Sequence, residues 1–307
     1  MDKIKVLLLS IHYPLAMKNY WENAFRRNPN IELKTTGPYT GSFIPWMGGM
    51  TLPEKYAVPP TYPLPFKPNV GRIPYALVKA QLGEWIPDLV ITINAGIDWT
   101  QKPTDGFVAS VGTDGHCLDY THSRKISDKF FNMHPKYAKP NDVLLSYAFD
   151  PKVHYAMSDV EKDMDAVLIG MPYPQRIEWV TALRARGVTV LFENGPIFDE
   201  YRVLNNRARI GLNWSSLGDL NARFFELLAF RLCVVADRCD DMERMGFIEG
   251  THYLGFSNTQ EAIDKVLWAK NNPDEAQMIA NNGYQFVHSQ NYTYDSLAQK
   301  VLDEFRL

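Results

Sequence analysis

The chain alternates between short apolar runs and longer segments in which apolar residues recur at helical spacing. Nearly unbroken apolar runs occupy Ile4–Ser10, Asp88–Asn94 and Gly106–Asp114, and such runs are typical of parallel strands buried on both faces. Asp142–Ala148 predicts a fourth strand. Lys18–Arg27 predicts a helix, because its apolar residues share one side. Strands separated by helices or long crossovers indicate a parallel α/β sheet.

The same pattern restarts in the second half of the chain. Strands are predicted at Asp165–Gly170, Ala208–Asn213 and Leu232–Asp237, and a helix is predicted at Arg176–Gly187, where the glycine is a natural stop. Two α/β series of about equal length predict two Rossmann-like domains. The stretch Pro151–Lys162 is polar and has no periodicity, so the domain boundary is expected there.

Three later helices carry start signals or a clear apolar stripe. Asn258 with Glu261 three residues on forms a capping-box arrangement. Asn272 is the expected N-cap of the next helix, with Pro273 in its first position. Tyr294–Phe305 places its apolar residues on one face, and that face needs a partner.

The segment 38–75 does not fit the α/β rhythm. It contains nine of the chain's twenty prolines, and proline removes backbone donors and restricts φ. We therefore expect irregular structure and no sheet. A long ordered loop in a compact domain is usually functional, so a substrate-binding lid and a packing-only excursion both stay open. Its aromatic residues are Phe43, Trp46, Tyr56, Tyr62 and Phe66.

Composition narrows the function classes. At 307 residues with 46% hydrophobic and 22% charged content, the chain has the make-up of a soluble globular protein. Its net charge of −3 argues against tight, nonspecific binding of nucleic acid, although a local basic groove is compatible with that total. Three scattered cysteines suit neither a disulfide framework nor a zinc site. We expect a cytoplasmic protein without a signal peptide or a membrane span.

The first turn of the second series is a candidate phosphate site. The sequence Leu168–Arg176 lacks the dinucleotide fingerprint. A strand, a turn and a helix at this point still direct backbone N–H groups and a helix N-terminus at a bound anion. Arg176 adds a cation with bidentate reach. The alternative is an ordinary surface arginine.

Glu226 is the one acid in an otherwise apolar helix that is expected to start near Asn221 or Ala222. It follows the strand Ala208–Asn213, and ligands in open α/β sheets bind at the carboxyl ends of strands. A carboxylate there can accept two hydrogen bonds from a vicinal diol such as a ribose. The alternative is an acid that the helix dipole favours near the N-terminus. Beside it stand Asp219, Asn221 and Arg223.

The first domain offers a polar loop after the strand Gly106–Asp114. Asp114 and His116 stand at the carboxyl edge of the predicted sheet, where either could position a sugar or accept a proton. Asp119 and His122 follow on the same loop. These residues lack the helical spacing of a known metal motif, so no metal site is expected. For His116, the alternative is a loop histidine with structural hydrogen bonds.

The segment Ala208–Asp237 resembles the nucleotide-sugar segment of glycosyltransferases with the GT-B fold, and most of all their spore-maturation-protein-like (CgeB-like) branch. That branch typically has a Leu-Asn pair, a polar loop, and then Arg-x-Phe-Glu. The resemblance covers roughly the last half of the chain and the first half in patches. The matching positions are Leu212, Asn213, Arg223, Phe225 and Glu226.

The resemblance implies an α/β protein of GT-B fold, with two Rossmann-like domains whose parallel sheets face a cleft. It implies an N-terminal acceptor-side domain at 1–157 and a nucleotide-sugar-binding domain at 158–290. Residues 291–307 would form a C-terminal helix that packs back on the first domain.

It also implies a metal-independent glycosyltransferase that needs no cofactor and takes a nucleotide diphosphate sugar, expected to be a UDP-sugar, as donor substrate. Glu226 would bind the ribose hydroxyls, while Arg176 and Arg223 would bind the diphosphate. Catalysis would involve His116 and Asp114. The remaining donor-binding candidates are Gly170, Asn213, Asp219 and Asn221.

One departure from the family's pattern leaves alternatives open. Retaining GT-B enzymes often carry a Glu-x7-Glu pair, but Gly218 stands eight residues before Glu226 and Asp219 is one position away. The stereochemical outcome is therefore open, and so is a nucleotide-sugar-binding protein without transfer activity. A phage-type DNA base glycosyltransferase and a sugar-nucleotide epimerase are further alternatives. The acceptor is a small molecule, a glycan or a modified DNA base.

Overall fold

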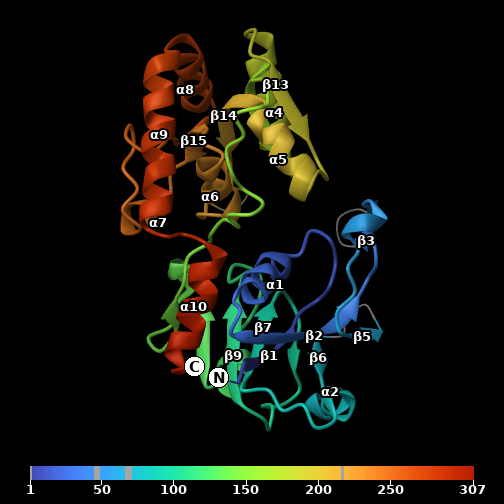
Figure 1. The fold of residues 1–307 in the computed structure, drawn as a ribbon. Helices are drawn as coiled ribbons and strands as arrows, with labels where there is room; N and C mark the ends of the chain where they lie inside the picture. Colours follow the sequence, from blue (N-terminus) through green and yellow to red (C-terminus); the bar gives the residue numbers. More distant parts are fainter. Residues whose placement is uncertain (1, 45–48, 66–70, 216–217) are drawn as a thin grey trace. The chain divides into compact units, whose positions relative to one another are not determined.

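The computed structural model describes residues 2–44, 49–65, 71–215 and 218–307. The chain divides into two compact units (Figure 1). Unit 1 comprises Met1–Ser146 and Tyr294–Leu307, and unit 2 comprises Tyr147–Thr293. The first division falls after Ser146, ahead of the boundary expected after residue 157.

Unit 1 is built on a seven-stranded sheet in the order β11-β10-β9-β7-β1-β2-β5, and every neighbouring pair is parallel. The parallel α/β architecture predicted from the apolar runs is confirmed. The predicted strand Asp142–Ala148 is reduced to the short β11. The strands are β1 (Ile4–Leu9), β2 (Ile31–Tyr39), β5 (Tyr62–Pro65), β7 (Leu89–Asn94), β9 (Phe107–Gly112), β10 (Lys129–Asn132) and β11 (Val143–Leu144).

Three helices and two small strand pairs complete this part of unit 1. The small pairs join β3 to β4 and β6 to β8. The predicted helix Lys18–Arg27 has the predicted bounds. The elements are α1 (Lys18–Arg27), α2 (Tyr75–Leu82), α3 (Thr121–Ile126), β3 (Phe43–Ile44), β4 (Met50–Thr51), β6 (Arg72–Ile73) and β8 (Asp98–Trp99), with 3₁₀ turns η2 (Glu54–Tyr56) and η3 (Pro135–Tyr137).

The proline-rich segment 38–75 does contribute to the sheet, so the expectation of no sheet there was wrong. β5 pairs in parallel with β2 through residues such as Thr36 and Tyr62. It is the last strand of the sheet, and an edge strand tolerates the missing N–H groups of Pro63 and Pro65. Trp46 and Phe66 of this segment lie outside the described residues.

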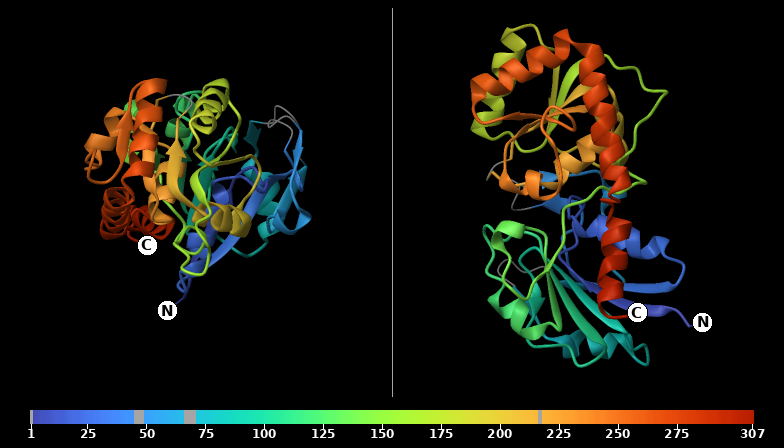
Figure 2. Two further views of the ribbon diagram at one scale, coloured as in Figure 1. Left: turned by 90° about the horizontal axis from the view of Figure 1, so that it is seen from above. Right: turned by 90° about the vertical axis from the view of Figure 1, so that its left-hand side faces the viewer.

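The last helix, α10 (Tyr294–Glu304), belongs to unit 1 although unit 2 precedes it in the chain. The ring of Tyr294 is fully buried and lies 5.9 Å from that of Trp21 on α1. Arg27 and Asp295 form an ion pair of 2.8 Å between the same two helices. The final helix therefore packs against α1 of unit 1, and Figure 2 shows its ribbon in that unit.

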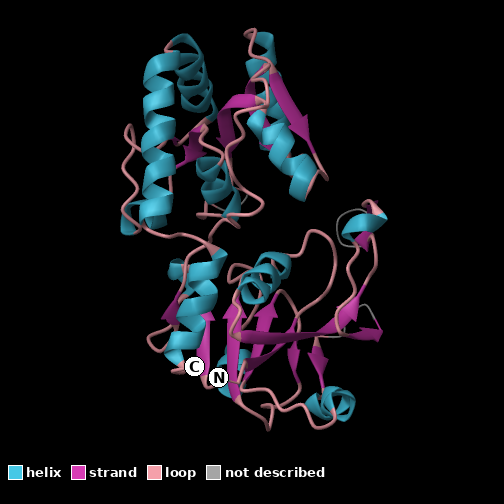
Figure 3. Cartoon of the chain, in the orientation of Figure 1, coloured by secondary structure: helices cyan, strands magenta, loops and turns pink. Residues whose placement is uncertain are grey.

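Unit 2 contains a five-stranded sheet in the order β13-β12-β14-β15-β16, again with parallel pairing throughout. Figure 3 shows its strands among the helices of the unit. Its elements are β12 (Met164–Ile169), α4 (Pro174–Ala185), β13 (Val190–Glu193), α5 (Phe198–Asn206), β14 (Ala208–Asn213), α6 (Ala222–Ala229), β15 (Cys233–Asp237), α7 (Asp240–Arg244), β16 (Leu254–Phe256), α8 (Thr259–Asn271) and α9 (Pro273–Ser289).

Helix starts in unit 2 follow local sequence signals. The side chain of Asn258 accepts a hydrogen bond from the N–H of Glu261 at 3.0 Å, so the predicted cap of α8 is confirmed. Asn272 stands at the N-cap position of α9, but its side-chain amide donates to the carbonyl of Trp268 instead. The start of α6 at Ala222 also agrees with the sequence. Within the described residues, no helix is both long and apolar enough to cross a membrane.

Candidate active site

The candidate donor site of unit 2 lies where the order of the strands reverses direction. The chain runs from β12 to β13 on one side and then crosses to β14 on the other side of β12. Ligands of open α/β sheets bind at the carboxyl ends of the strands at such a switch point. Gly170 follows β12, and Asn213 is the last residue of β14.

Two arginines from different helices meet above Gly170. A Cβ atom placed on Gly170 would lie 2.9 Å from Nη2 of Arg223 and 3.4 Å from Nη1 of Arg176. Arg176 belongs to the first turn of α4, and Arg223 to the first turn of α6. Gly170 also has a φ of +153°, a conformation that favours glycine. A glycine here lets both guanidinium groups approach the backbone.

The guanidinium of Arg176 is buried and joins the loops after β12 and β14. Nε and Nη2 both donate to the carbonyl oxygen of Trp214, at 3.0 and 2.7 Å, and Nη1 donates to that of Met171 at 3.0 Å. Burial, together with the charge of Arg223, lowers the pKa of Arg176 to about 10. The alternative of an ordinary surface arginine is excluded, since Arg176 is 3% exposed.

Neither arginine is neutralised by a carboxylate within ion-pair distance among the described residues. Nη1 of Arg223 is buried and has no hydrogen-bond partner there. Asn213 is fully buried, and both polar atoms of its side chain lack a partner in the same part of the chain. Buried donors and acceptors without partners are costly, and a polar, anionic ligand would supply partners for the two arginines.

The side chain of Glu226 is buried against residues from two other segments of unit 2. Its Oε2 accepts a hydrogen bond from the hydroxyl of Tyr201 at 2.7 Å, and its Oε1 lies 3.7 Å from Nε2 of His154. The Nδ1 atom of His154 accepts the backbone N–H of Asp150 at 2.9 Å. The neutral ring therefore carries its proton on Nε2, which faces the carboxylate.

Burial determines the titration of this pair. It raises the pKa of Glu226 to about 7, although the hydrogen bond from Tyr201 and the charge of Arg223 oppose the shift. It lowers the pKa of His154 to about 3, with a contribution from Arg202. A raised carboxyl pKa in a site of this kind is common where ligands bind.

The first turn of α6 does not depend on Glu226. The side chain of Asn221 accepts a hydrogen bond from the N–H of Phe224 at 3.3 Å and so caps the helix. Asp219 lies beside the cap, where its N–H donates to the hydroxyl of Ser215 at 3.2 Å. Ser215 in turn donates its N–H and its hydroxyl to the carboxylate of Asp237, at the end of β15. These bonds hold the loop that presents Arg223.

The polar residues that follow β9 in unit 1 have different surroundings. Asp114 lines a cavity at the carboxyl end of β9. His116 is exposed, and its ring lies 5.8 Å from that of His134. Asp119 accepts hydrogen bonds from Thr121, and His122 bonds the carbonyl of Trp99 through Nε2 at 2.9 Å. Asp119 and His122 therefore have structural roles.

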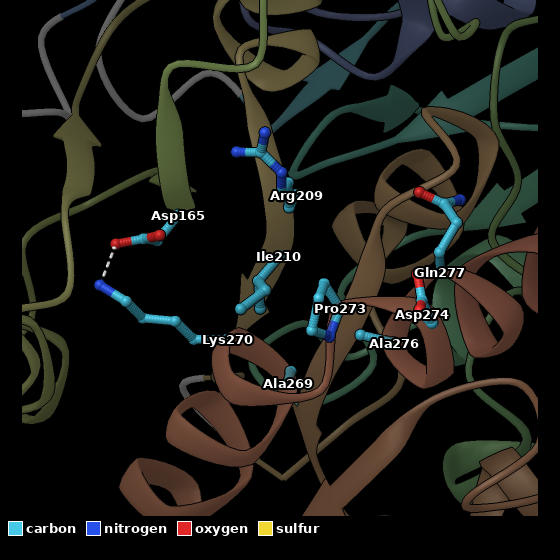
Figure 4. A pocket seen from close by; sticks show the side chains of 9 residues that line it. All are labelled: Asp165, Arg209, Ile210, Ala269, Lys270, Pro273, Asp274, Ala276 and Gln277. Carbon is cyan, nitrogen blue, oxygen red and sulfur yellow. Dashed lines mark hydrogen bonds and ion pairs between the residues drawn. The ribbon is translucent and has the colours of Figure 1, made fainter.

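Another cavity, of about 260 Å³, lies at the opposite edge of the sheet of unit 2 (Figure 4). It is lined by residues at the amino ends of β12 and β14, including Asp165 and Arg209. Lys270 points toward Asp165 there and pairs with it at 2.7 Å. Because the cavity lies at the amino ends of the strands, where open α/β sheets do not bind their ligands, we do not assign it as the donor site.

The search for metal-binding groups covers only the described ranges of the chain. In those ranges, no cluster of three or more His, Cys, Asp or Glu side chains is placed to hold a metal ion.

The comparisons with known proteins agree with this architecture. Residues 155–303 match a family described as glycosyl transferase-like. No curated protein matches the sequence.

Solved structures match over nearly the whole chain. Sucrose-phosphate synthase from Thermosynechococcus elongatus is 13% identical, with 99% of this chain and 98% of that chain covered and a TM-score of 0.64. Anabaena HepE in complex with UDP and glucose is 10% identical, with 99% of each chain covered and a TM-score of 0.64. A UDP-N-acetylglucosamine 2-epimerase is 12% identical, with 99% and 96% covered and a TM-score of 0.58.

The predicted GT-B fold is confirmed by these full-length matches. Together, the family match and the fold support a glycosyltransferase. Sequence reasoning missed two residues that contact or face Glu226, namely Tyr201 and His154. No role was predicted for either residue, and His154 lies in the polar stretch Pro151–Lys162, where the domain boundary was expected.

Proposed function

We propose that this protein transfers a sugar from a nucleotide diphosphate sugar, specifically a UDP-sugar, to a hydroxylated acceptor without a metal ion. One observation carries the proposal: Arg176 and Arg223 meet over Gly170 at the switch point, with no carboxylate at ion-pair distance among the described residues. A diphosphate supplies the missing negative charge and the acceptors for their N–H groups. Structures of similar fold that contain UDP support the choice of nucleotide.

Each donor-site residue has a place in this proposal. Arg176 and Arg223, with the helix N-termini of α4 and α6, would stabilise the charge that develops on the leaving diphosphate. Asn213 would bind the same group through its side-chain amide. Glu226 would accept hydrogen bonds from the ribose hydroxyls, with Tyr201 holding its second oxygen.

The pattern Leu212, Asn213, Arg223, Phe225 and Glu226 further supports the spore-maturation-protein-like branch of GT-B enzymes. The three free cysteines suit the reducing conditions of the cytoplasm.

Asp114 and His116 are the proposed proton-transfer groups of the acceptor side. Asp114 lines a cavity at a strand end, and His116 follows it on the same loop. If His116 acts in proton transfer, His116→Ala should lower turnover by about 10²–10⁴-fold and leave UDP affinity unchanged. Steady-state transfer rates with a saturating donor measure this. If His116→Ala turns over as fast as the wild type, His116 does not take part in proton transfer.

Calorimetric titration of UDP tests the donor site. Arg223→Met should weaken UDP binding at least tenfold, because it removes a charged hydrogen-bond donor worth about 1.5–3 kcal/mol. Arg186→Met is the matched control, since Arg186 stands at the other end of α4, and it should bind UDP normally. If Arg223→Met binds UDP as tightly as Arg186→Met does, the diphosphate does not bind at this site.

Turnover of the donor separates a transferase from a binding protein. A UDP-sugar incubated with the intact protein should release UDP, slowly by hydrolysis and faster with an acceptor. Because a 2-epimerase shares the fold, the sugar product must be identified too. Tight UDP binding with no UDP release from the sugar would leave only a binding function.

A further inference from the structure

A cavity of about 200 Å³ lies wholly within unit 1 and has no role in the donor site. It opens at the carboxyl ends of β1, β7 and β9, beside the start of α1. Its lining includes Ser10, Tyr13, Lys18, Ile93, Thr113 and Asp114.

The position of this cavity follows from the topology of the sheet. The chain runs from β1 to β2 on one side and later returns to β7 on the other side of β1. The ends of β1 and β7 therefore form the topological switch point of unit 1, which is where open α/β sheets bind ligands. The cavity is the counterpart, in unit 1, of the donor site of unit 2.

Lys18 is the unusual residue of the lining. It is the first residue of α1 and only 3% exposed. Its Nζ donates to Oε2 of Glu22 at 2.8 Å, its one hydrogen-bond partner in the described part of the chain. Burial lowers the pKa of Lys18, although Glu22 opposes the shift. An ammonium group has three donors, so donors remain for a ligand in the cavity.

Glu22 does not depend on Lys18 alone. Its other oxygen, Oε1, accepts hydrogen bonds from Nε and Nη2 of Arg26 at 3.0 and 2.8 Å. The cluster of Lys18, Glu22 and Arg26 therefore contains two cations and one carboxylate. The N-terminus of α1 adds the partial positive charge of a helix dipole at the same place.

Asp114 supplies the opposite charge at the end of β9. Its Oδ2 accepts the hydroxyl of Thr113 at 2.6 Å, and its backbone N–H donates to the hydroxyl of Tyr120 at 2.8 Å. These bonds hold the carboxylate in place. β7 lies between β9 and β1 in the sheet, so the two strand ends are about 10 Å apart. Lys18 belongs to α1 and Asp114 follows β9, so the positive and the negative group of the lining come from separate elements.

We propose that this cavity binds the acceptor, and that the acceptor is a small polyhydroxylated molecule with an oxyanion. The oxyanion binds the ammonium group of Lys18, and a hydroxyl group donates to Asp114. This inference rests on the proposed transfer reaction, and it names the class of molecule that the reaction uses. The sugar then passes to that hydroxyl oxygen, the bond to the diphosphate breaks, and the hydroxyl proton leaves to Asp114.

The size of the cavity supports a small acceptor. Sites for drug-sized ligands have volumes of about 300–1,000 Å³, and this one has about 200 Å³. One sugar unit with a phosphate or a carboxylate suits that volume. A long glycan could place only its terminal unit there.

Calorimetry with the intact protein and three probes tests the proposal, with glucose as the neutral reference and glucose 6-phosphate and glucuronate as the two anions. At least one anion should bind at least tenfold more tightly than glucose. The stronger anion identifies the oxyanion as a phosphate or a carboxylate. Equal affinity for all three probes, or no binding of either anion, would overturn the proposal. This comparison needs no variant.

Two variants locate the binding. Lys18→Met should abolish the preference for the anion, while Glu22→Gln, which changes the same ion pair but keeps the ammonium, should preserve it. A preference that survives Lys18→Met in a folded protein would place the anion elsewhere. UDP titrations run in parallel keep the two proposals apart. UDP affinity should be the same in both variants as in the wild type. If the wild type does not bind UDP, that result counts against the proposed donor site alone.

Discussion

At the scale of single residues, Glu226 shows how the site is prepared. A carboxylate in an apolar helix is costly when it is buried without partners. Here Tyr201 donates to one oxygen, and His154 faces the other. Asn221, and not Glu226, caps the helix. The carboxylate is therefore held in place by residues from outside its own helix.

Glu226→Gln should change stability in a pH-dependent way. The pKa of Glu226 is about 7 in the folded protein and 4.5 for the ordinary group. Between these values the folded state binds more protons than the unfolded state, so stability falls as the pH rises. Glutamine does not titrate, so the free energy of unfolding of the variant does not fall in this way. Relative to the wild type, it should rise by up to about 3 kcal/mol between pH 4.5 and 8. Urea unfolding at both pH values measures the difference, and a constant difference would contradict the raised pKa.

The same variant tests the ribose assignment at pH 8, where the wild-type carboxylate is ionised. Donor affinity should fall by about ten- to a hundredfold, because charged hydrogen bonds contribute about 1.5–3 kcal/mol. UDP titration of both proteins measures it. Unchanged affinity would remove Glu226 from the site.

Gly170→Ala should weaken UDP binding by displacing Arg223. Its Cβ would lie 2.9 Å from Nη2 of Arg223. Gly187→Ala is the matched control, because Gly187 also has a positive φ, of +76°, but no atom within 4 Å of the added Cβ. Both variants should lose stability, by about 1–3 kcal/mol. Only Gly170→Ala should lose UDP affinity, and equal UDP binding by the two would show that Arg223 adjusts without cost.

At the scale of elements, the first turns of α4 and α6 position the two arginines of the candidate site. Each helix places one arginine in its first turn, and the two helices follow adjacent strands of the sheet. The hydrogen bonds from Arg176 to the carbonyls of Met171 and Trp214 join the two strand–helix loops. The geometry of the pair therefore depends on how each helix begins.

Asn221→Ala should lower both stability and UDP affinity. Loss of an N-cap costs about 1 kcal/mol, and Arg223 is in the turn that the cap orders. Asn258→Ala removes a similar cap from α8, far from the arginines in the chain, and should lower stability alone. Thermal unfolding and UDP titration of both variants check this. A fall in UDP affinity with Asn258→Ala would point to a general loss of structure.

At the scale of the whole molecule, each unit carries one candidate site at its own switch point. The proposed donor site comprises arginines, helix N-termini and an asparagine, and we infer no metal ligand among them. UDP binding should therefore survive EDTA unchanged. Calorimetry before and after EDTA treatment measures it, with Mg²⁺ or Mn²⁺ added back. Binding that EDTA abolishes and a metal restores would show that the donor site needs a metal ion.

Much of the fold could be predicted from local patterns. The bounds of α1, the start of α6 and the cap of α8 all follow from residues within one or two turns of each other. The buried parallel strands follow from apolar runs such as Val6–Leu9. β2 was missed because its polar residues, among them Lys34 and Thr35, interrupt the apolar run, although Ile31 and Leu33 alternate with polar neighbours. These signals act over a few residues, and the sequence displays them directly.

The sequence by itself determined the fold class, the arginines and the single acid. Only the tertiary structure decided which of them act together. Arg176 and Arg223 converge because β12 and β14 are neighbours in the sheet, and Tyr201 and His154 reach Glu226 from separate segments. Lys18 becomes a candidate ligand-binding group because the chain crosses from β5 back to β7 and leaves a cavity at the end of β1. Strand order and side-chain burial depend on contacts between residues far apart in the chain, and local periodicity carries no record of those contacts.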